Sequence, residues 1–285
     1  MLKIPAQGGW SNGDATYVGD NPPDDEVITY YLKKRHIFGD MKIEVLDAAG
    51  KLMGTVPSTK RRGLSRVRWS MRLKPPKVPP AASAAFGAAY GPRVLPGTYT
   101  VKMTKDEKVY TLPLQLVPDS RTKHTLADRQ AQFALANRLV ALLGDMSFAV
   151  ERINGVRSAL ADRASKLPTG DPLAQRLRDA SASADVLRKK IVATKEGGMI
   201  TGEERLRENL TDLYSAVIFY EGRPSQMQLD RTVAIGHELS DVVAAFDAWS
   251  AKDLAALNNE LGAKNLQPIV LITRQDWEAV GKGGQ

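Results

Sequence analysis

Residue types that commonly carry catalysis or bind metals are sparse and scattered in this sequence. The histidines, His36, His124 and His237, lie far apart, and none has a second ligand close to it along the chain. His237-Glu238 begins like the zinc-protease motif H-E-x-x-H, but position 241 is aspartate instead of histidine. There is no cysteine, no phosphate-binding glycine loop and no nucleophile motif. We therefore predict no catalytic residue, no cofactor and no metal site.

The acidic residues gather in one place, where Glu203, Glu204, Glu208 and Asp212 open a helical pattern. Glycoside hydrolysis needs two carboxylates that face each other across a cleft. The first turn of a helix attracts acidic residues for a simpler reason, because the positive end of the helix dipole stabilises them. We interpret the cluster as a helix start, and a hydrolase is the least favoured alternative.

The main basic run consists of Lys60, Arg61, Arg62, Arg66 and Arg68. If residues 63–73 form a strand, Arg66 and Arg68 share its wet face, and Trp69 lies on the core face. A nucleic-acid site would need aromatic rings beside the arginines, so this pattern disfavours nucleic acid. Charge on an edge strand prevents aggregation, which is the interpretation that we prefer. The candidate contacts with a protein or glycan partner are Trp10, Arg62, Arg66, Arg68, Phe86 and Tyr90.

The first part of the chain carries the two-residue periodicity of strands. Apolar and polar residues alternate in segments 27–33, 41–47, 51–56, 63–73, 98–104 and 112–116. Short strands separated by turn signals predict an antiparallel β-sandwich of immunoglobulin or fibronectin III type over residues 23–119. Residues 1–22 are expected to form an extended leader. The Pro/Ala-rich stretch 74–92 is expected to be a long surface loop of the sandwich.

From residue 120 the period changes to that of a helix. Helices are expected from Thr125 to Lys166, from Pro172 towards Gly197, from Thr201 to residue 220, and from residue 225 to 262. Four amphipathic helices with short connections bury their apolar stripes as an antiparallel bundle, so residues 120–265 are predicted to form one. Residues 266–285 form a C-terminal extension. In it, 269–272 is expected to be extended and 273–280 to add a helical turn.

Charge is unevenly distributed between these two parts. Residues 1–120 contain 18 Lys and Arg against 11 Asp and Glu, whereas the remainder contains 22 against 21, within a formal net charge of +8. A basic β half could meet acidic glycans, an acidic protein or nucleic acid. No uninterrupted apolar run approaches the ~18 residues of a membrane span. The N-terminus has no apolar signal-peptide core, so no export signal is expected in the sequence as given.

Six stretches are similar to the C-terminal region of bacterial sortilin-like β-propeller proteins, which are often labelled BNR-repeat glycosyl hydrolases. They cover residues 21–32, 43–52, 63–72, 91–103, 201–214 and 221–231, in the order found in that family. The resemblance implies an immunoglobulin-like domain that accompanies a propeller, and an extracytoplasmic location. The family's repeated Asp-box, S-x-D-x-G-x-x-W, does not occur here. Any hydrolase activity would therefore belong to a propeller that this sequence does not contain.

These observations leave three hypotheses. The first is a non-catalytic accessory module that docks onto a protein, with a β-propeller of the same polypeptide or complex as the expected partner. The second is a polysaccharide-binding module of a secreted glycoside hydrolase, in which Trp10, Phe86 or Tyr90 stacks on sugars beside the basic face. The third is part of a glycosyl hydrolase whose catalytic propeller lies elsewhere. Sedimentation with insoluble polysaccharide distinguishes the first two hypotheses. Binding that is lost in Tyr90→Ala would favour the polysaccharide-binding module.

Overall fold

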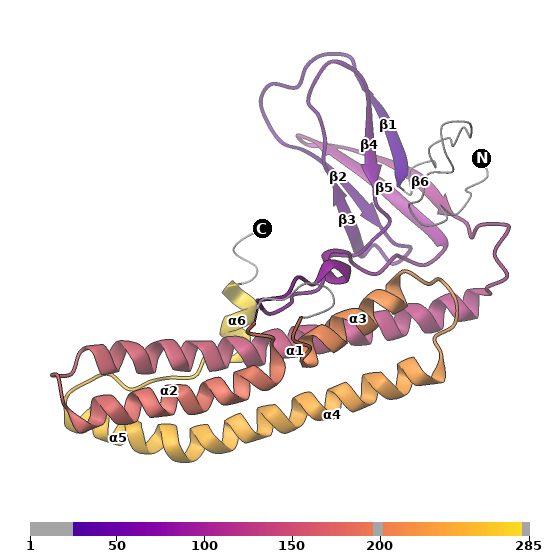
Figure 1. The fold of residues 1–285 in the computed structure, drawn as a ribbon. Coiled ribbons are helices and arrows are strands. Elements are labelled where there is room, and N and C mark those ends of the chain that lie inside the picture. The colour runs from indigo at the N-terminus through magenta and orange to yellow at the C-terminus, as the bar shows by residue number, and fades with distance from the viewer. Residues whose placement is uncertain (1–24, 196–201, 281–285) are drawn as a thin grey trace, which may run out of the picture. The chain divides into compact units, whose positions relative to one another are not determined.

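A computed structural model describes residues 25–195 and 202–280, apart from the side chains of Phe86 and Val280. The protein is α+β, with antiparallel sheets in the N-terminal part followed by helices (Figure 1), which confirms that coarse part of the prediction. The chain divides into two compact units. The β unit contains the residues up to Leu73 together with Pro96–Ser120. The helical unit contains Lys74–Leu95 together with the residues from Arg121 onwards.

The described part of the β unit has six strands in two antiparallel sheets. One sheet pairs β1 (Glu26–Leu32) with β4 (Gly63–Trp69). The other has the order β3-β2-β5-β6 and contains β2 (Met41–Leu46), β3 (Leu52–Val56), β5 (Gly97–Lys105) and β6 (Lys108–Leu116). Four strands lie within one residue of their predicted bounds, because the alternation of apolar and polar residues that defines them is local. Strand β4 ends four residues earlier than predicted, and β6 begins four residues earlier.

Trp69 at the end of β4 connects the two sheets. Its ring packs edge-to-face on Tyr99 of β5, with 5.6 Å between the ring centroids. On the other side it lies so close to Gly54 of β3 that a Cβ there would come within 2.8 Å of the indole nitrogen. The prediction that Trp69 belongs to the core is therefore confirmed. The remaining core side chains of the unit are Leu32, Ile43, Val45, Val56 and Val101.

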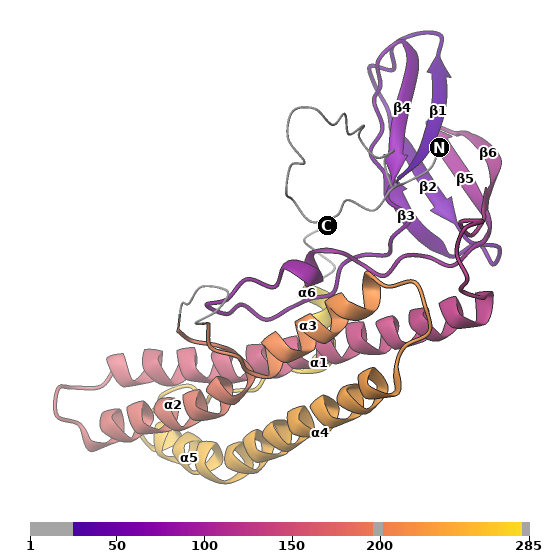
Figure 2. The ribbon, with the colours of Figure 1, turned by 45° about the vertical axis from the view of Figure 1, so that its right-hand side comes forward.

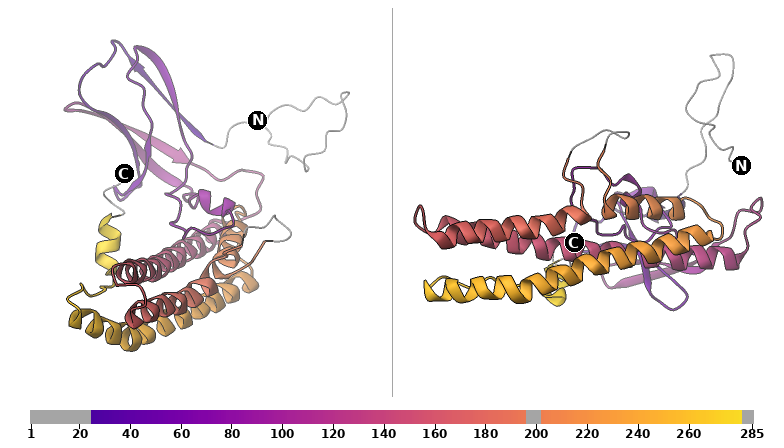
Figure 3. Two further views of the ribbon diagram at one scale, coloured as in Figure 1. Left: turned by 60° about the vertical axis from the view of Figure 1, so that its left-hand side comes forward. Right: turned by 60° about the horizontal axis from the view of Figure 1, so that its bottom comes forward.

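The helical unit is organised along the 40-residue helix α1 (Leu126–Ser165), which begins at a capping box between Thr125 and Asp128. It continues through α2 (Pro172–Ile191), α3 (Leu206–Ile218), α4 (Gln226–Trp249), a π-helical turn η2 (Ser250–Leu254) and α5 (Ala255–Ala263). Helices α2 and α4 run alongside α1 (Figure 3). A single apolar cluster, including Leu139, Leu143 and Leu210, fills the space between them.

Three helix boundaries differ from prediction. The second helix was expected to run towards Gly197, whereas α2 ends at Ile191. The third helix was expected to start at Thr201, which lies outside the described residues, with Glu204 in its capping box. Helix α3 instead starts at Leu206, and the carboxylate of Glu208 accepts the Arg205 N–H (3.1 Å). The fourth helix was expected to be continuous from 225 to 262, but η2 interrupts it before α5.

The segment Lys74–Leu95, which we call the strap, is the main departure from prediction. We expected a surface loop of the sandwich, yet the strap packs against α1 and α3 and contains the short 3-10 helix η1 (Phe86–Ala89) beside α3 (Figure 2). Ala88 joins the apolar cluster of the helices. Small residues and prolines let the strap approach the helices closely, and polar helix side chains bind its carbonyl groups.

The C-terminal extension also belongs to the helical unit. Asn258 of α5 exchanges two hydrogen bonds with the backbone of Ile269 (3.0 and 2.8 Å), and Ile269 is buried. Helix α6 (Arg274–Val280) follows, and Arg274 binds Asp145 of α1. The expected final helical turn is therefore present as α6, whereas residues 269–272 form neither a strand nor a helix.

Helix α1 is the one helix in the described residues that is long and apolar enough to cross a membrane by length and composition. A core helix of a water-soluble protein passes the same test. Here α1 contacts α2, α3 and α4, and its buried residues extend from Arg129 to Ala164. Of the most apolar 18-residue window of α1, 39% is buried among the other helices.

Candidate functional site: a cationic face on the β unit

The outer face of the β1–β4 pair carries the arginines that the sequence singled out. Leu32, Ser65 and Trp69 are buried, so the residues that alternate with them point to solvent. Arg66 and Arg68 are on this outer face, about 6.7 Å apart along the strand. Their cross-strand partners are Thr29 and Val27.

An aromatic ring shares this face with the arginines. Tyr31 of β1 is paired with Leu64 of β4, one position along the outer face from the pair formed by Thr29 and Arg66. The Tyr31 side chain is 62% exposed, so its ring is accessible to a ligand. Strand β4 has no aromatic residue on this face, and the pairing of β4 with β1 supplies one from another strand.

A second basic segment meets the first at the end of the strand pair. Leu32 is paired with Gly63, so Lys33, Lys34 and Arg35 continue β1 where Arg61 and Arg62 precede β4. The two segments are joined by the His36 N–H, which donates to the carbonyl of Lys60 (2.9 Å), and by the Lys60 ammonium, which donates to the carbonyl of Gly39 (2.7 Å).

We call these residues the cationic face: Tyr31, Lys33, Lys34, Arg35, Arg61, Arg62, Arg66 and Arg68. All of its basic side chains are exposed, and none makes an ion pair with another described residue. Two carboxylates of the β unit are engaged elsewhere, because Glu44 binds Lys42 and Lys102 while Asp106 binds Lys105. The face therefore presents a net positive potential, which attracts anions.

His36 directly follows Lys33, Lys34 and Arg35 and packs into the interior of the β unit. It is buried, and its Nε2 lies 3.5 Å from a carboxylate oxygen of Asp106 in the β5–β6 turn. Gly39 has a positive φ of 83°, and a Cβ there would collide with the Asp106 carboxylate. The Asp106 N–H also donates to the carbonyl of Asp40 (3.0 Å). These contacts hold residues 36–40 in place and thereby position Lys33, Lys34 and Arg35.

The predicted contact residues do not all belong to this site. Arg62, Arg66 and Arg68 are brought together. Tyr90 is exposed but belongs to the strap in the helical unit, where it packs edge-to-face on Phe219 and its carbonyl accepts the Tyr214 hydroxyl (2.7 Å). Trp10 lies outside the described residues, as does the side chain of Phe86.

Sequence analysis missed Tyr31 and the basic residues at positions 33–35. The signal for the latter was present, since Lys-Lys-Arg directly follows an alternating strand. The location of Tyr31 beside the arginines had no local signal, because it depends on which strands pair.

The acidic cluster of α3 has a structural role at two of its positions. Glu203 accepts the N–H groups of Thr194 (2.8 Å) and Lys195 (3.3 Å) and binds Arg205. The backbone N–H of Thr194, followed by Arg205, lowers the pKa of Glu203 to about 2. Glu208 caps α3 and forms a buried ion pair with Arg207 (2.7 Å). The interpretation of the cluster as part of a helix start is thus supported at Glu208.

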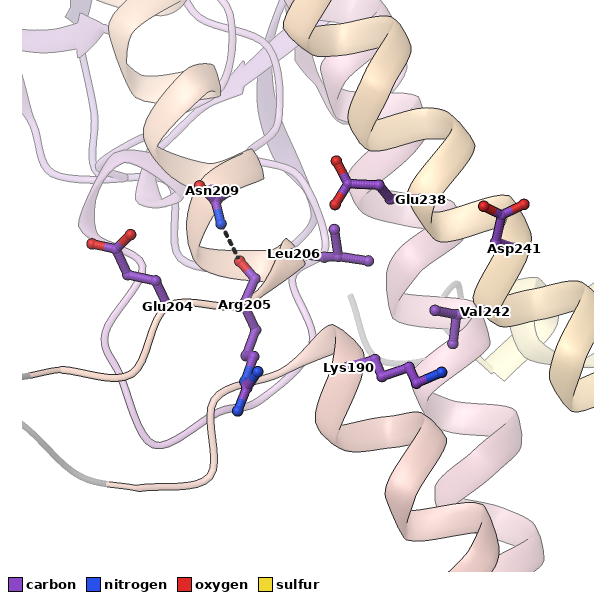
Figure 4. Close-up of a pocket in the computed structure, with 8 residues that line it drawn as sticks. All are labelled: Lys190, Glu204, Arg205, Leu206, Asn209, Glu238, Asp241 and Val242. Atoms are coloured by element: carbon purple, nitrogen blue, oxygen red, sulfur yellow. Dashed lines mark hydrogen bonds between the residues drawn. The ribbon is translucent and has the colours of Figure 1, made fainter.

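A pocket of about 360 Å³ opens between the end of α2, the start of α3 and the middle of α4 (Figure 4). Lys190 lies at its base, Glu204 and Arg205 on one wall, and Glu238 and Asp241 on the other. Glu238 binds Arg231 (3.1 Å) and Arg205 binds Glu203. The charges that line the pocket are of both signs, in contrast to the single sign of the cationic face.

Among the residues that the structure describes, no three His, Cys, Asp or Glu side chains are grouped so that they could hold a metal ion. Comparison with protein-family models, with curated proteins and with solved structures finds no match to this chain.

Proposed function

We propose that this protein is a non-catalytic binding module that docks onto an acidic surface of a partner protein through the cationic face. The observation that carries the proposal is the convergence of two sequence-distant basic segments whose side chains have no acidic partner among the residues that the structure describes. Like charges placed close together repel one another, and an acidic partner would turn this cost into attraction. Electrostatic complementarity of this kind gives fast and selective association.

The architecture supports the same function. In this proposal the β unit is an immunoglobulin-like or fibronectin III-like sandwich with Trp69 between its sheets, and the helices form an antiparallel bundle that serves as scaffold. The resemblance to sortilin-like proteins favours a β-propeller in the same polypeptide or complex as the partner, outside the cytoplasm. Any hydrolase activity would belong to that propeller.

Binding of an acidic polysaccharide is a second candidate, and the exposure of Tyr31 favours it. A tyrosine ring offers a flat apolar surface with a polar tip, suited to packing against a ring of the ligand. Tyr31 lies on the same face as Arg66, so one ligand could contact the ring and the guanidinium together. For an acidic protein, we expect the arginines to contribute more to binding than the Tyr31 ring.

Charge reversal tests the proposed function. The variant Arg66→Glu/Arg68→Glu should retain its fold, because both side chains are exposed, and should bind immobilised polyglutamate about tenfold more weakly at low salt. The control Arg138→Glu/Lys252→Glu makes the same change in net charge at exposed positions of the helical unit and should bind normally. Binding of the natural chain should also weaken as salt is added.

Two changes distinguish the two candidate functions: the choice of immobilised ligand and the removal of the Tyr31 ring. With polygalacturonate as the immobilised ligand, Tyr31→Ala should weaken binding if the module recognises a polysaccharide, and should leave polyglutamate binding unchanged. Equal retention of the charge-reversed variant and its control on both ligands would overturn the role of the cationic face.

A further inference from the structure

The helical unit binds a segment of its own chain in the way that a receptor binds an extended peptide. Three side chains of α1 and α3 donate to backbone carbonyls of the strap. Arg207 binds the carbonyl of Pro79 (2.8 Å) and Tyr214 that of Tyr90 (2.7 Å). The Ser147 hydroxyl lies 3.0 Å from the carbonyl of Lys77 and shares its proton with the carbonyl of Leu143 in its own helix (2.9 Å). Recognition through carbonyls fixes the path of a proline-rich segment, which has few N–H groups to offer.

The polar centre of this contact is buried. The side chains of Arg207 and Glu208 are only 6% and 10% exposed, and the strap completes their bonding. The hydroxyl of Ser83 donates to Glu208 (2.7 Å), and it also accepts from Arg207 (3.0 Å). Without the strap, the ion pair would lose the hydrogen bonds of Ser83 and of the Pro79 carbonyl.

The shapes of strap and helices also fit closely. A Cβ on Gly87 would approach the Cβ of Ser215 on α3 to 2.4 Å. Pro79, Ala88 and Pro92 are buried, and the Lys77 ammonium lies 4.4 Å from the ring centre of Trp277 on α6. The groove therefore selects small residues and proline at defined positions of the strap.

The strap contacts the helices but is not adjacent to them along the chain. Both ends of the strap continue into the β unit, towards β4 on one side and β5 on the other. The helices from α1 onwards are joined covalently to everything before them through residues 117–125 alone. This hinge is exposed, apart from the partly buried His124. Residues up to Leu116 and residues from Leu126 are thus two halves, linked by one hinge and by the strap contact.

We propose that the strap is exchangeable and that the partner able to fill the helical groove is a second copy of this chain. In an exchanged dimer, each helical half would receive the strap of its partner with the same hydrogen bonds, and only residues 117–123 of the hinge would change conformation. Exchange of identical elements is a low-cost route to dimers because the contacts are preserved. This inference is independent of the cationic face and of its ligand.

The test uses the full chain with a site-specific protease sequence placed in residues 117–123. After folding and cleavage, the two halves should co-elute in size-exclusion chromatography. Equal amounts of two cleaved chains are mixed, one tagged at the N-terminus and the other untagged and labelled with ¹⁵N. About half of the helical halves recovered on the tag should then carry the ¹⁵N label of the untagged copy. Uncleaved chain at high concentration should contain a dimer.

A strap variant assigns the association to the groove. Gly87→Val should lower the recovery of helical halves severalfold, whereas Gly155→Ala, on the open side of α1, should leave it unchanged. Immediate separation of the halves after cleavage would overturn the proposal. So would retention without exchange between copies, or equal recovery from the Gly87→Val chain.

Discussion

At the scale of single residues, the buried ion pair between Arg207 and Glu208 depends on several hydrogen-bond partners. Both side chains are almost fully buried, and burial of a charge is costly unless it is paired and hydrogen-bonded. Their neighbours meet this demand, because Ser83, the Pro79 carbonyl and the Arg205 N–H all bind the pair. The pair therefore makes the strap a requirement for a stable α3.

Removal of one charge tests this dependence. Glu208→Ala should lower the free energy of unfolding by about 3–5 kcal/mol, because it leaves Arg207 buried without its counter-ion. Asp212→Ala, at an exposed position of the same helix, should change it by less than about 0.5 kcal/mol. Chemical denaturation followed by circular dichroism measures both, and similar effects from the two variants would contradict the argument.

Glu203 gives the protein a defined sensitivity to acid. Its pKa is lowered from 4.5 to about 2 by hydrogen bonds that the carboxylate accepts in the folded state. A lowered folded-state pKa contributes stability above pH 4.5, and this contribution is lost as the pH falls towards 2. Glu203→Gln should therefore make the loss of stability between pH 5 and pH 2 shallower. Glu204→Gln, which changes an exposed side chain, is the control.

At the scale of elements, α1 combines great length with an interior glycine. Gly155 lies on the exposed side of the helix, and a Cβ there would meet nothing within 4 Å. Glycine inside a helix is destabilising relative to alanine because it loses more backbone entropy on folding. Gly155→Ala should raise the free energy of unfolding by about 0.5–1 kcal/mol, measured in urea. An unchanged or lower value would contradict this expectation.

Substitution of Gly87 in the strap should lower stability, in contrast to Gly155→Ala. Gly87→Val forces side-chain atoms against Ser215 of α3 and should destabilise the helical unit by about 1–3 kcal/mol. The same denaturation experiment measures it, with Gly155→Ala beside it as a substitution in open space. If Gly87→Val were neutral, the strap would not be packed as described.

At the scale of the whole molecule, the chain forms two cores from interleaved segments. The β core surrounds Trp69, and the helical core includes the strap as well as the helices. A mutation should act first on the core that contains it, since separate cores can unfold in separate transitions. Interleaving also means that removing residues 74–95 would damage the helical unit, although the flanking strands belong to the other.

Mutations in each core test this division. Leu143→Ala, at a fully buried position of α1, should lower the stability of the helical transition at 222 nm by about 2–5 kcal/mol. Val45→Ala in β2 should leave that transition in place and shift the fluorescence change of Trp69 in a background in which the other tryptophans are replaced by phenylalanine. A single transition displaced equally by both variants would show that the units unfold as one.

The sequence by itself determined the elements and their kinds. Alternation predicted the strands, and the 3.6-residue period predicted the helices. Thr125, Asp171-Pro172 and Ser225 marked three helix starts within a residue, because capping involves neighbours along the chain. Wherever the deciding interaction spans only a few residues, the pattern was sufficient.

Only the tertiary structure decided where the strap lies and what the cationic face contains. The strap is held by Ser147, Arg207 and Tyr214, which are some 70 to 130 residues away from the carbonyls that they bind. Tyr31 joins the arginines through the pairing of β1 with β4. Such contacts leave no local period in the sequence, because their energy depends on surfaces that exist only after distant segments have folded together.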